Sequence, residues 1–246
     1  MTELFELCII VPCYNEEKRL NTKRFYNFLK SQKNVLICFV NDGSSDKTFE
    51  VLTTIKSKFP NNVEAISTPT NVGKAEAVRT GILHCNTHFK HKKIAYLDAD
   101  LATTLEECYE ISELVTKKIV FAFGSRIKKI DTKIERKGYR FLIGRVIATF
   151  ISRQLKLGVY DTQCGCKIFK SELSKTIFKD KFISKWLFDV ELFHRIIKIY
   201  GVDKMCEIST EVPLKSWIDY DESKVKMTYF FKLWLDLYQI KKAYAN

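Results

Sequence analysis

The sequence predicts an α/β fold in which a mostly parallel central sheet is flanked by helices. Apolar, strand-like runs alternate with helix-like stretches from the start of the chain to about residue 124, a pattern typical of parallel sheets covered by helices. Most of these runs end in polar or glycine-containing turn sequences. A chain of 246 residues is long enough to bury one large core. We therefore expect a single domain over residues 1–246.

The predicted strands are short apolar or β-branched runs bounded by turn residues. They cover residues 7–11, 35–40, 63–67, 93–97, 119–123 and 207–212. The helices expected between and after them end near residues 33, 59, 85, 117, 157 and 244. Residues 127–137 are polar and basic and are expected to form a loop.

Composition limits the class of protein and its partners. The net charge of +12 favours a polyanionic partner, such as nucleic acid, anionic lipid or a phosphorylated substrate, or else a solvated basic surface. Cys8, Cys38 and Cys85 lie in apolar runs, where cysteine behaves as a small hydrophobe. We expect no disulfide scaffold and a reducing compartment. No apolar run reaches 18 residues, which predicts a protein that is soluble or lies on a membrane. With the reducing compartment, we expect a cytoplasmic protein that is peripheral at the inner face of the membrane.

Two acids at the end of one apolar run carry the strongest functional signal. Residues 93–97 lead directly into Asp98-Ala99-Asp100, and ligands of parallel α/β sheets bind where strands end. The two carboxylates would repel each other unless a cation lay between them and an oxygen-rich ligand. Mg²⁺ or Mn²⁺ fits, because such ions take one or two carboxylates plus substrate phosphates. The pattern predicts a metal-dependent enzyme acting on a sugar nucleotide.

Three further polar residues are expected at the same edge of the sheet. Asp42 follows the second strand, where it is placed to accept from a ribose hydroxyl or a base N–H. Lys74 lies near the start of a helix, and a cation beside a helix N-terminus suits phosphate. Arg126 follows another strand and is expected to point into the same crevice. The plainer interpretations are a strand-to-helix turn for Asp42 and a surface cation for Lys74.

Two later helices have features that suit a membrane surface. The helix over 139–157 is strongly apolar, with Arg145, Arg153 and Lys156 on one side, as in helices that lie among lipid headgroups. The alternative is a helix packed on the core of its own domain. The C-terminal helix, expected over 224–244, alternates aromatic residues with lysines. It could pack on the core, bind a membrane or join two subunits in a homodimer.

Several motifs together resemble glycosyltransferase family 2. They occur in the order and spacing of that family at residues 11–17, 41–46, 71–74, 98–100 and 124–126. Residues 161–167, Asp-Thr-Gln-Cys-Gly-Cys-Lys, further resemble the branch that contains dolichyl-phosphate β-glucosyltransferase and dolichyl-phosphate mannose synthase. The resemblance covers residues 7 to about 217.

That resemblance implies a GT-A fold, with residues 1–126 binding the nucleotide sugar and residues 127–246 facing the acceptor. It implies a divalent cation on Asp98 and Asp100, and an approach of Arg126 to a substrate phosphate. We take Asp100, Asp161 and Arg126 as the candidate catalytic residues. The implied nucleotide-sugar contacts are Pro12, Tyr14, Glu16, Val40, Asp42, Lys74 and Asp98.

The resemblance also implies inverting transfer of a hexose from a nucleotide-diphosphate sugar of the UDP-glucose or GDP-mannose type. The arginines and lysines between residues 126 and 156 favour a polyprenyl phosphate acceptor, which needs cations rather than a base. A hydroxyl acceptor would need a general base, for which Asp161 comes first and Asp189 or Glu191 next. A non-enzymatic protein that binds nucleic acid is a remote alternative, because acidic side chains lie where the phosphates of a nucleic acid would have to bind.

The acceptor side departs from the family pattern. The mannose-synthase branch usually carries an arginine shortly before a Ser-Lys pair, whereas here residues 219–222 are Asp-Tyr-Asp-Glu. Lys215 and Lys224 are therefore the candidates for a second phosphate-binding cation. The acceptor-side candidates are Gln163, Lys167, Asp189, Glu191, Lys215 and Lys224.

Overall fold

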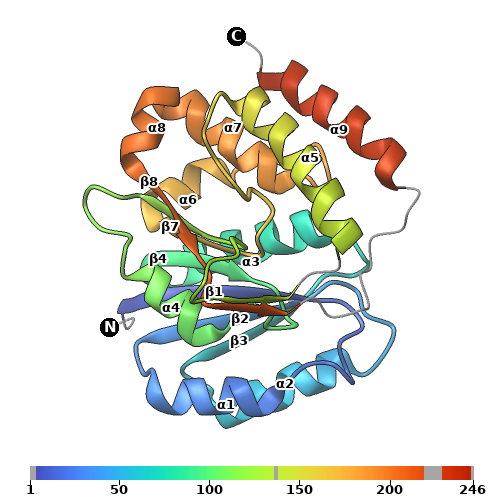
Figure 1. The fold of residues 1–246 in the computed structure, drawn as a ribbon. Helices are drawn as coiled ribbons and strands as arrows, with labels where there is room; N and C mark the ends of the chain where they lie inside the picture. Colours follow the sequence, from blue (N-terminus) through green and yellow to red (C-terminus); the bar gives the residue numbers. More distant parts are fainter. Residues whose placement is uncertain (1–3, 136–137, 219–228, 245–246) are drawn as a thin grey trace.

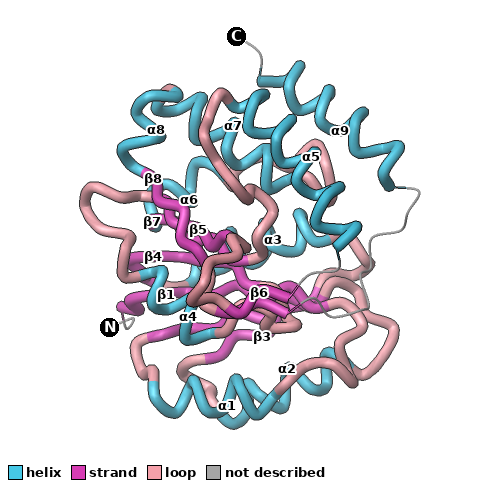
Figure 2. The backbone as a smooth tube through the Cα atoms, in the orientation of Figure 1, coloured by secondary structure: helices cyan, strands magenta, loops and turns pink. Residues whose placement is uncertain are grey.

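The computed structural model describes residues 4–135, 138–218 and 229–244. A central sheet lies between two layers of helices (Figure 1, Figure 2). Within the described residues this sheet has seven strands, in the spatial order β3-β2-β1-β4-β7-β5-β8. Their bounds are β1 Leu4–Cys13, β2 Val35–Asn41, β3 Val63–Ser67, β4 Lys90–Leu97, β5 Phe121–Ser125, β7 Cys166–Lys170 and β8 Ser209–Pro213.

The sheet is parallel except for one inserted strand. β1 pairs in parallel with β2 and β4, β2 with β3, and β5 with β8. β7 lies between β4 and β5 and runs antiparallel to both. The prediction of a mostly parallel sheet flanked by helices is confirmed, but β7 was not predicted as a strand. Because it runs the opposite way, β7 begins at the edge where β4 and β5 end.

Helices cover both faces of the sheet. One face carries α1 Thr22–Ser31, α2 Thr48–Lys58 and α4 Leu105–Ser112. The other carries α3 Lys74–His88, α5 Gly138–Leu155, α6 Ser171–Ile177, α7 Phe188–Tyr200, α8 Val202–Ile208 and α9 Tyr229–Tyr244. A small parallel pair, β6 Lys133–Glu135 and β9 Ser216–Ile218, stands apart from the main sheet.

The central strands are continuously apolar because both of their faces are buried. Successive side chains of a strand point to opposite faces, and both faces of this sheet are covered by helices. Leu7 and Ile9 of β1 therefore join the core under α1, whereas Cys8 and Ile10 join the core under α3. A strand buried on both faces is expected to be a continuous apolar run.

Several sequence-based boundaries need correction. Residues 207–208 end helix α8, so the last strand of the main sheet begins at Ser209. The expected loop over 127–137 contains β6, which pairs with β9. The short strands β6 and β9 form because they pair with each other across a long stretch of sequence. No periodic pattern in the sequence predicts them. The helix expected from residue 224 is described from Tyr229 onward.

The α5 helix is partly a core helix. Ile147 and Ile151 are buried in the main core, as the core-packing alternative predicted, whereas Val146 and Phe150 are about half exposed. No helix among the described residues has the length and apolar character needed to cross a bilayer. All eight cysteines are free, and Cys206 is the exposed one.

Candidate active site

The ends of β1 and β2 form the first wall of the site. Asp42 is buried, and its Oδ1 and Oδ2 accept from the backbone N–H groups of Val72 and Gly73 at 2.8 and 2.9 Å. This carboxylate therefore fixes the turn that leads into α3. Close packing at this point also requires Gly43, which has φ +61° and whose added Cβ would lie 2.3 Å from the carbonyl carbon of Thr70.

The remaining predicted nucleotide contacts lie near the ends of β1 and β2. Pro12 stands opposite Val40 in the parallel register. The side chain of Val40 is buried against α3, which leaves only its backbone for a ligand. Tyr14 is exposed, whereas Glu16 is buried and its backbone N–H donates to Thr48 Oγ1 at 2.7 Å.

The acid pair after β4 lies beside a lysine. Lys74, the first residue of α3, places its Nζ 2.5 Å from Oδ1 of Asp98. Burial alone would lower the pKa of Lys74, but the carboxylates of Asp98, Asp189 and Asp100 outweigh it and raise that pKa. Burial, followed by the negative charge of Asp98, raises the pKa of Asp100. The charged form of Asp100 is thus disfavoured beside a second carboxylate.

This donor set fits a hard divalent cation. Asp100 Oδ1 accepts from the Ala102 N–H at 3.0 Å, which orients one carboxylate. In the part of the chain that the structure describes, no cluster of three or more His, Cys, Asp or Glu side chains is placed to hold a metal. A cation at Asp98 and Asp100 would therefore complete its shell with ligand phosphates and water, as Mg²⁺ typically does.

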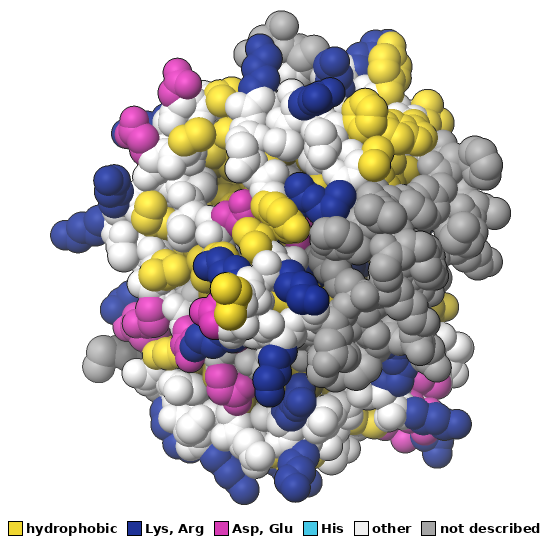
Figure 3. Space-filling model, viewed as in Figure 1, with side chains coloured by type: hydrophobic (Ala, Val, Ile, Leu, Met, Phe, Trp, Pro, Cys, Tyr) yellow, Lys and Arg dark blue, Asp and Glu magenta, His cyan; other side chains and the backbone are white. Residues whose placement is uncertain are grey.

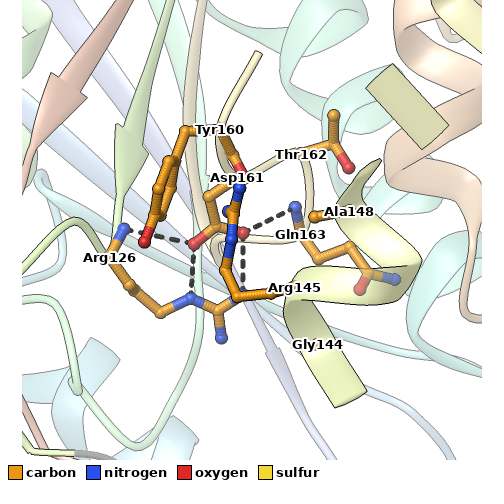
Figure 4. Close-up of a pocket in the computed structure, with 8 residues that line it drawn as sticks. All are labelled: Arg126, Gly144, Arg145, Ala148, Tyr160, Asp161, Thr162 and Gln163. Carbon is orange, nitrogen blue, oxygen red and sulfur yellow. Dashed lines mark hydrogen bonds and ion pairs between the residues drawn. The ribbon is translucent and has the colours of Figure 1, made fainter. Parts of the chain in front are cut away.

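Arg126 and Asp161 form a two-pronged ion pair (Figure 4). Arg126 Nε and Nη2 donate to Oδ2 and Oδ1 of Asp161 at 2.6 and 2.8 Å, and the Arg126 backbone N–H donates to Oδ2 at 3.1 Å. The Gln163 N–H adds a bond to Oδ1 at 3.1 Å. Burial disfavours the charged guanidinium, but Asp161 outweighs it and raises the pKa of Arg126. Both oxygens of Asp161 are thus engaged.

A small cavity of about 50 Å³ adjoins this pair. Its second cation is Arg145 of α5, whose Nη1 donates to the Tyr160 carbonyl at 2.9 Å. The guanidinium carbon of Arg145 stands 3.7 Å from the centre of the Tyr160 ring. Figure 4 shows both arginines directed toward the Tyr160–Gln163 segment. The lining residues are Arg126, Gly144, Arg145, Ala148, Tyr160, Asp161, Thr162 and Gln163.

The cavity and the acid pair are connected through one loop. The Asp98 N–H donates to the carbonyl of Gly165 at 3.1 Å. A Cβ added to Gly165 would lie 1.9 Å from Asp98 Oδ2, so a larger residue here would require the carboxylate or the loop to move. The charge of Asp98 also contributes to raising the pKa of Arg126. The loop that carries Asp161 therefore passes directly beside Asp98.

Two acceptor-side candidates prove to be core residues. Lys167 is fully buried on β7, where its Nζ donates to Asp189 Oδ1 at 2.6 Å and to the Cys164 carbonyl at 2.7 Å. The Tyr96 hydroxyl donates to the same oxygen of Asp189. These contacts place Lys167 and Asp189 beneath the Asp161–Gly165 loop, where they support it and do not face the cavity.

The other acceptor-side candidates are scattered. Glu191 is fully buried, pairs with Arg195 at 2.8 Å and accepts from the Ile183 N–H at 2.8 Å, a structural role that argues against it as a base. Lys215 is exposed and pairs with Glu110. Gln163 is exposed and lines the cavity. Lys224 lies outside the described residues.

Comparison with known sequences decides the family. Residues 8–178 match the sequence model described as Glycosyl transferase family 2. The chain belongs to glycosyltransferase family 2. Among the proteins similar to this family 2 glycosyltransferase are three named dolichyl-phosphate beta-glucosyltransferase, each from a different organism. The one from Trichomonas vaginalis is 33% identical over 95% of this chain and 72% of its own. The others are from Dictyostelium discoideum (31%, over 89% and 68%) and Saccharomyces cerevisiae (31%, over 98% and 75%).

Solved structures confirm the fold of this family 2 glycosyltransferase. Glucosyl-3-phosphoglycerate synthase from Mycobacterium tuberculosis, in complex with Mn²⁺, UDP-glucose and phosphoglyceric acid, superposes with a TM-score of 0.69. The match covers 97% of this chain and 80% of that one at 14% identity. A second complex of the same enzyme, with Mg²⁺ and UDP, gives 0.66. At this identity the likeness shows the fold alone, and the predicted GT-A fold is confirmed.

Three residues that line the cavity or support its lining were not singled out from the sequence of this family 2 glycosyltransferase. Arg145 was noted only as a cation on an apolar helix and as one of the basic residues between residues 126 and 156. Tyr160 provides the ring and the carbonyl that hold Arg145. Glu211 on β8 accepts from the Asp161 N–H at 2.8 Å. Nothing in the sequence around Glu211 indicates that contact.

Proposed function

We propose that this chain transfers glucose, with inversion, from UDP-glucose to a dolichyl-type polyprenyl phosphate. The names of the similar proteins support the sugar and the acceptor. The solved complexes with UDP-glucose belong to a distant enzyme of the same fold, and they make UDP-glucose the donor to test first against GDP-mannose. The proposed cofactor is Mg²⁺ or Mn²⁺.

The Arg126–Asp161 pair is the observation that carries this proposal. A phosphate acceptor is already anionic at neutral pH and needs cations, which Arg126 and Arg145 supply at one cavity. A hydroxyl acceptor would instead need a free base. Asp161 accepts from Arg126 through both oxygens, which occupies the lone pairs that would take a proton. Its proposed role is to orient Arg126.

The donor side of the proposal uses the acid pair and Lys74. Asp98 and Asp100 would hold the divalent cation, which when bound neutralises the charge that grows on the departing diphosphate. Lys74 contacts Asp98 at the N-terminus of α3, where backbone N–H groups also favour phosphate. Asp42 holds the turn at Val72 and Gly73 in place beside that helix end.

Transfer to a hydroxyl group of a glycan is the second candidate function. It shares every donor contact and differs only in needing Asp161 as a base. To act as a base, Asp161 would have to break its contacts with Arg126. The three hydrogen bonds that Arg126 donates to Asp161 argue against that role.

A transfer assay with matched acceptors tests the proposal. Purified protein would be incubated with Mn²⁺, labelled UDP-glucose or GDP-mannose, and either a short polyprenyl phosphate or the corresponding polyprenyl alcohol. We expect label in the phosphate product from UDP-glucose, and none in the alcohol. Transfer to the alcohol at an equal rate would favour the hydroxyl alternative. Transfer from GDP-mannose alone would refute the proposed donor.

A further inference from the structure

The outward faces of α5 and α9 share an apolar patch. Phe150 of α5 meets Trp234 of α9 edge to face, with ring centroids 5.0 Å apart. The side chains around this contact are between 47% and 63% exposed, which is high for large apolar groups. We call the set the α5–α9 patch; its members are Val146, Phe150, Trp234, Leu235 and Tyr238. Figure 3 shows apolar side chains gathered at this part of the surface.

Helix geometry separates this patch from the core. Val146 and Phe150 are four residues apart and lie on one side of α5, whereas Ile147 and Ile151 on the adjoining side are buried. Likewise Trp234 and Tyr238 face outward from α9, while Leu233, Leu237 and Ile240 are buried. Each helix therefore has two apolar sides, and the core uses only one of them.

The exposed charges in the described parts of α5 and α9 are all of one sign. The described exposed charged residues of α5 and α9, together with Lys156 directly after α5, are cationic: Arg153, Lys156, Lys232, Lys241 and Lys242. The acidic residue of α9, Asp236, is buried and accepts from Ser184 Oγ at 2.6 Å. Among the described residues, these two helices thus expose apolar and cationic groups and no acid.

We propose that the α5–α9 patch docks on the surface of an anionic lipid bilayer. Aromatic and aliphatic side chains would enter the headgroup region while the neighbouring lysines and arginines meet lipid phosphates, as in interfacial amphipathic helices. A second copy of the chain fits less well. A symmetric contact would bring the same cations together from both sides, and the described parts of α5 and α9 expose no acid to neutralise them.

The position of the patch agrees with a lipid-linked acceptor, and this step alone rests on the proposed function. Arg145 and Ala148 of α5 line the cavity that holds the Arg126–Asp161 pair. Val146 and Phe150 alternate with them along the same helix and face outward. Docking through this side of α5 would bring lipid headgroups close to the cavity, so a lipid phosphate could reach Arg145 without leaving the bilayer.

Vesicle co-sedimentation tests the proposal. Full-length protein would be mixed with vesicles of phosphatidylcholine alone or with phosphatidylserine added. We expect binding to the anionic vesicles that weakens with salt. The variant Phe150→Ser/Trp234→Ser should lose it. A matched control, Phe49→Ser/Leu114→Ser, replaces exposed apolar residues elsewhere on the chain and should bind like the native protein.

A second pair of variants tests whether the lysines of α9 contribute to vesicle binding. Lys241→Gln/Lys242→Gln should weaken binding by about fivefold for each lysine lost. Lys23→Gln/Lys30→Gln removes the same charge from exposed positions of α1 and should weaken it much less. Unchanged binding of the Phe150/Trp234 variant, equal effects of the two lysine pairs, or no binding of the native protein would each overturn the proposal.

Two further measurements distinguish membrane docking from dimerisation and from a failure of the proposed function. Light scattering of the lipid-free protein should give a monomer; a dimer that the Phe150/Trp234 variant dissociates would assign the patch to a second copy instead. Transfer to a short, water-soluble polyprenyl phosphate reports on the proposed function without a membrane. Vesicle binding with no such transfer would reject the proposed function and leave the docking surface standing.

Discussion

Gly165 and Asp98 lie so close that a Cβ atom on Gly165 would stand 1.9 Å from Oδ2 of Asp98. The same pair is joined by a hydrogen bond from the Asp98 N–H to the Gly165 carbonyl at 3.1 Å. The loop proposed to face the acceptor is therefore in contact with a carboxylate proposed to act on the donor side. A small displacement of the loop is therefore expected to displace the Asp98 carboxylate, and the reverse.

The substitution Gly165→Ala tests this contact. The added methyl group must displace Asp98 or the loop, and a displacement of about 1 Å in an active site can cost on the order of a hundredfold in rate. We expect transfer to fall by at least about tenfold while the melting temperature changes little. Gly158→Ala is the matched control, because nothing lies within 4 Å of its added Cβ. Equal rates in the two variants would contradict the prediction.

The acid pair is tested by Asp100→Ala and Asp98→Asn. Losing an electrostatic partner of the leaving group costs on the order of 10²–10³ in rate, so we expect transfer to be nearly abolished. Stability should not fall in the metal-free Asp100 variant, because burial and Asp98 already disfavour the charged form of Asp100, as its raised pKa shows. Asp203→Asn, at an exposed position of α8, is the control. Full activity of the Asp100 variant would rule out the metal assignment.

Arg145 is expected to act on the acceptor alone. A hydrogen bond to a charged group contributes about 1.5–3 kcal/mol, so Arg145→Gln should raise KM for the polyprenyl phosphate by roughly tenfold or more. KM for UDP-glucose should stay unchanged. Arg153→Gln removes a cation from the same helix outside the cavity, and with a short, water-soluble polyprenyl phosphate as acceptor it should leave both constants near native. A change in the donor constant instead would place Arg145 on the nucleotide side.

The buried pair of Lys167 and Asp189 should matter for stability. Removing one partner of a buried ion pair leaves an uncompensated charge and costs about 3–5 kcal/mol. We expect Lys167→Met to lose stability on that scale in urea unfolding, and Asp189→Asn in the same chain to recover part of it. The exposed pair Lys204–Glu207 provides the control, because surface pairs contribute at most about 1 kcal/mol. Equal losses from Lys167→Met and Lys204→Met would contradict this assignment.

Two buried histidines predict a loss of stability in mild acid. Burial, and for His91 also the charge of Lys175, lowers the pKa of His91 and of His194 to about 4. The unfolded chain titrates near pH 6.5, so between pH 6.5 and 4 it binds more protons than the folded protein. The free energy of unfolding therefore has its full value above pH 6.5 and decreases as the pH drops toward 4. At pH 5 the loss is on the order of 1–2 kcal/mol for each histidine.

Urea midpoints at pH 7.5 and pH 5.0 measure this effect. His91→Gln should lose less stability than the native protein between the two values, since it no longer titrates. Thr87→Ala, which changes an exposed residue of α3 that does not titrate, should keep the native pH dependence. An identical loss in both variants would assign the acid sensitivity to other groups.

The positions of the proposed donor-side acids could be predicted from sequence because the signals for them are local. The strand that ends at Leu97 and the acids that follow it are contiguous in the chain. Parallel pairing then brings the ends of β1, β2 and β4 to one edge, so Asp42 and Asp98 could be assigned to a common site before their surroundings were known.

The acceptor side resisted prediction because its contacts are long-range. A lysine in a polar motif is ordinarily assigned to the surface, yet Lys167 is buried because Asp189, from a different helix, neutralises it. Asp189 was for the same reason taken for a possible base. β7 is only five residues long and owes its existence to two flanking strands. Such placements depend on partners that the local pattern does not reveal.

The insertion of β7 limits how this protein can be divided. A fragment ending after Arg126 would leave β4 and β5 without the strand that joins them, and Phe121 would lose the ring of Phe169, 5.0 Å away. Bare strand edges invite aggregation with other chains. Any chimera that exchanges acceptor specificity with a relative should therefore keep β7 with its own sheet and place the junctions in loops outside residues 166–170.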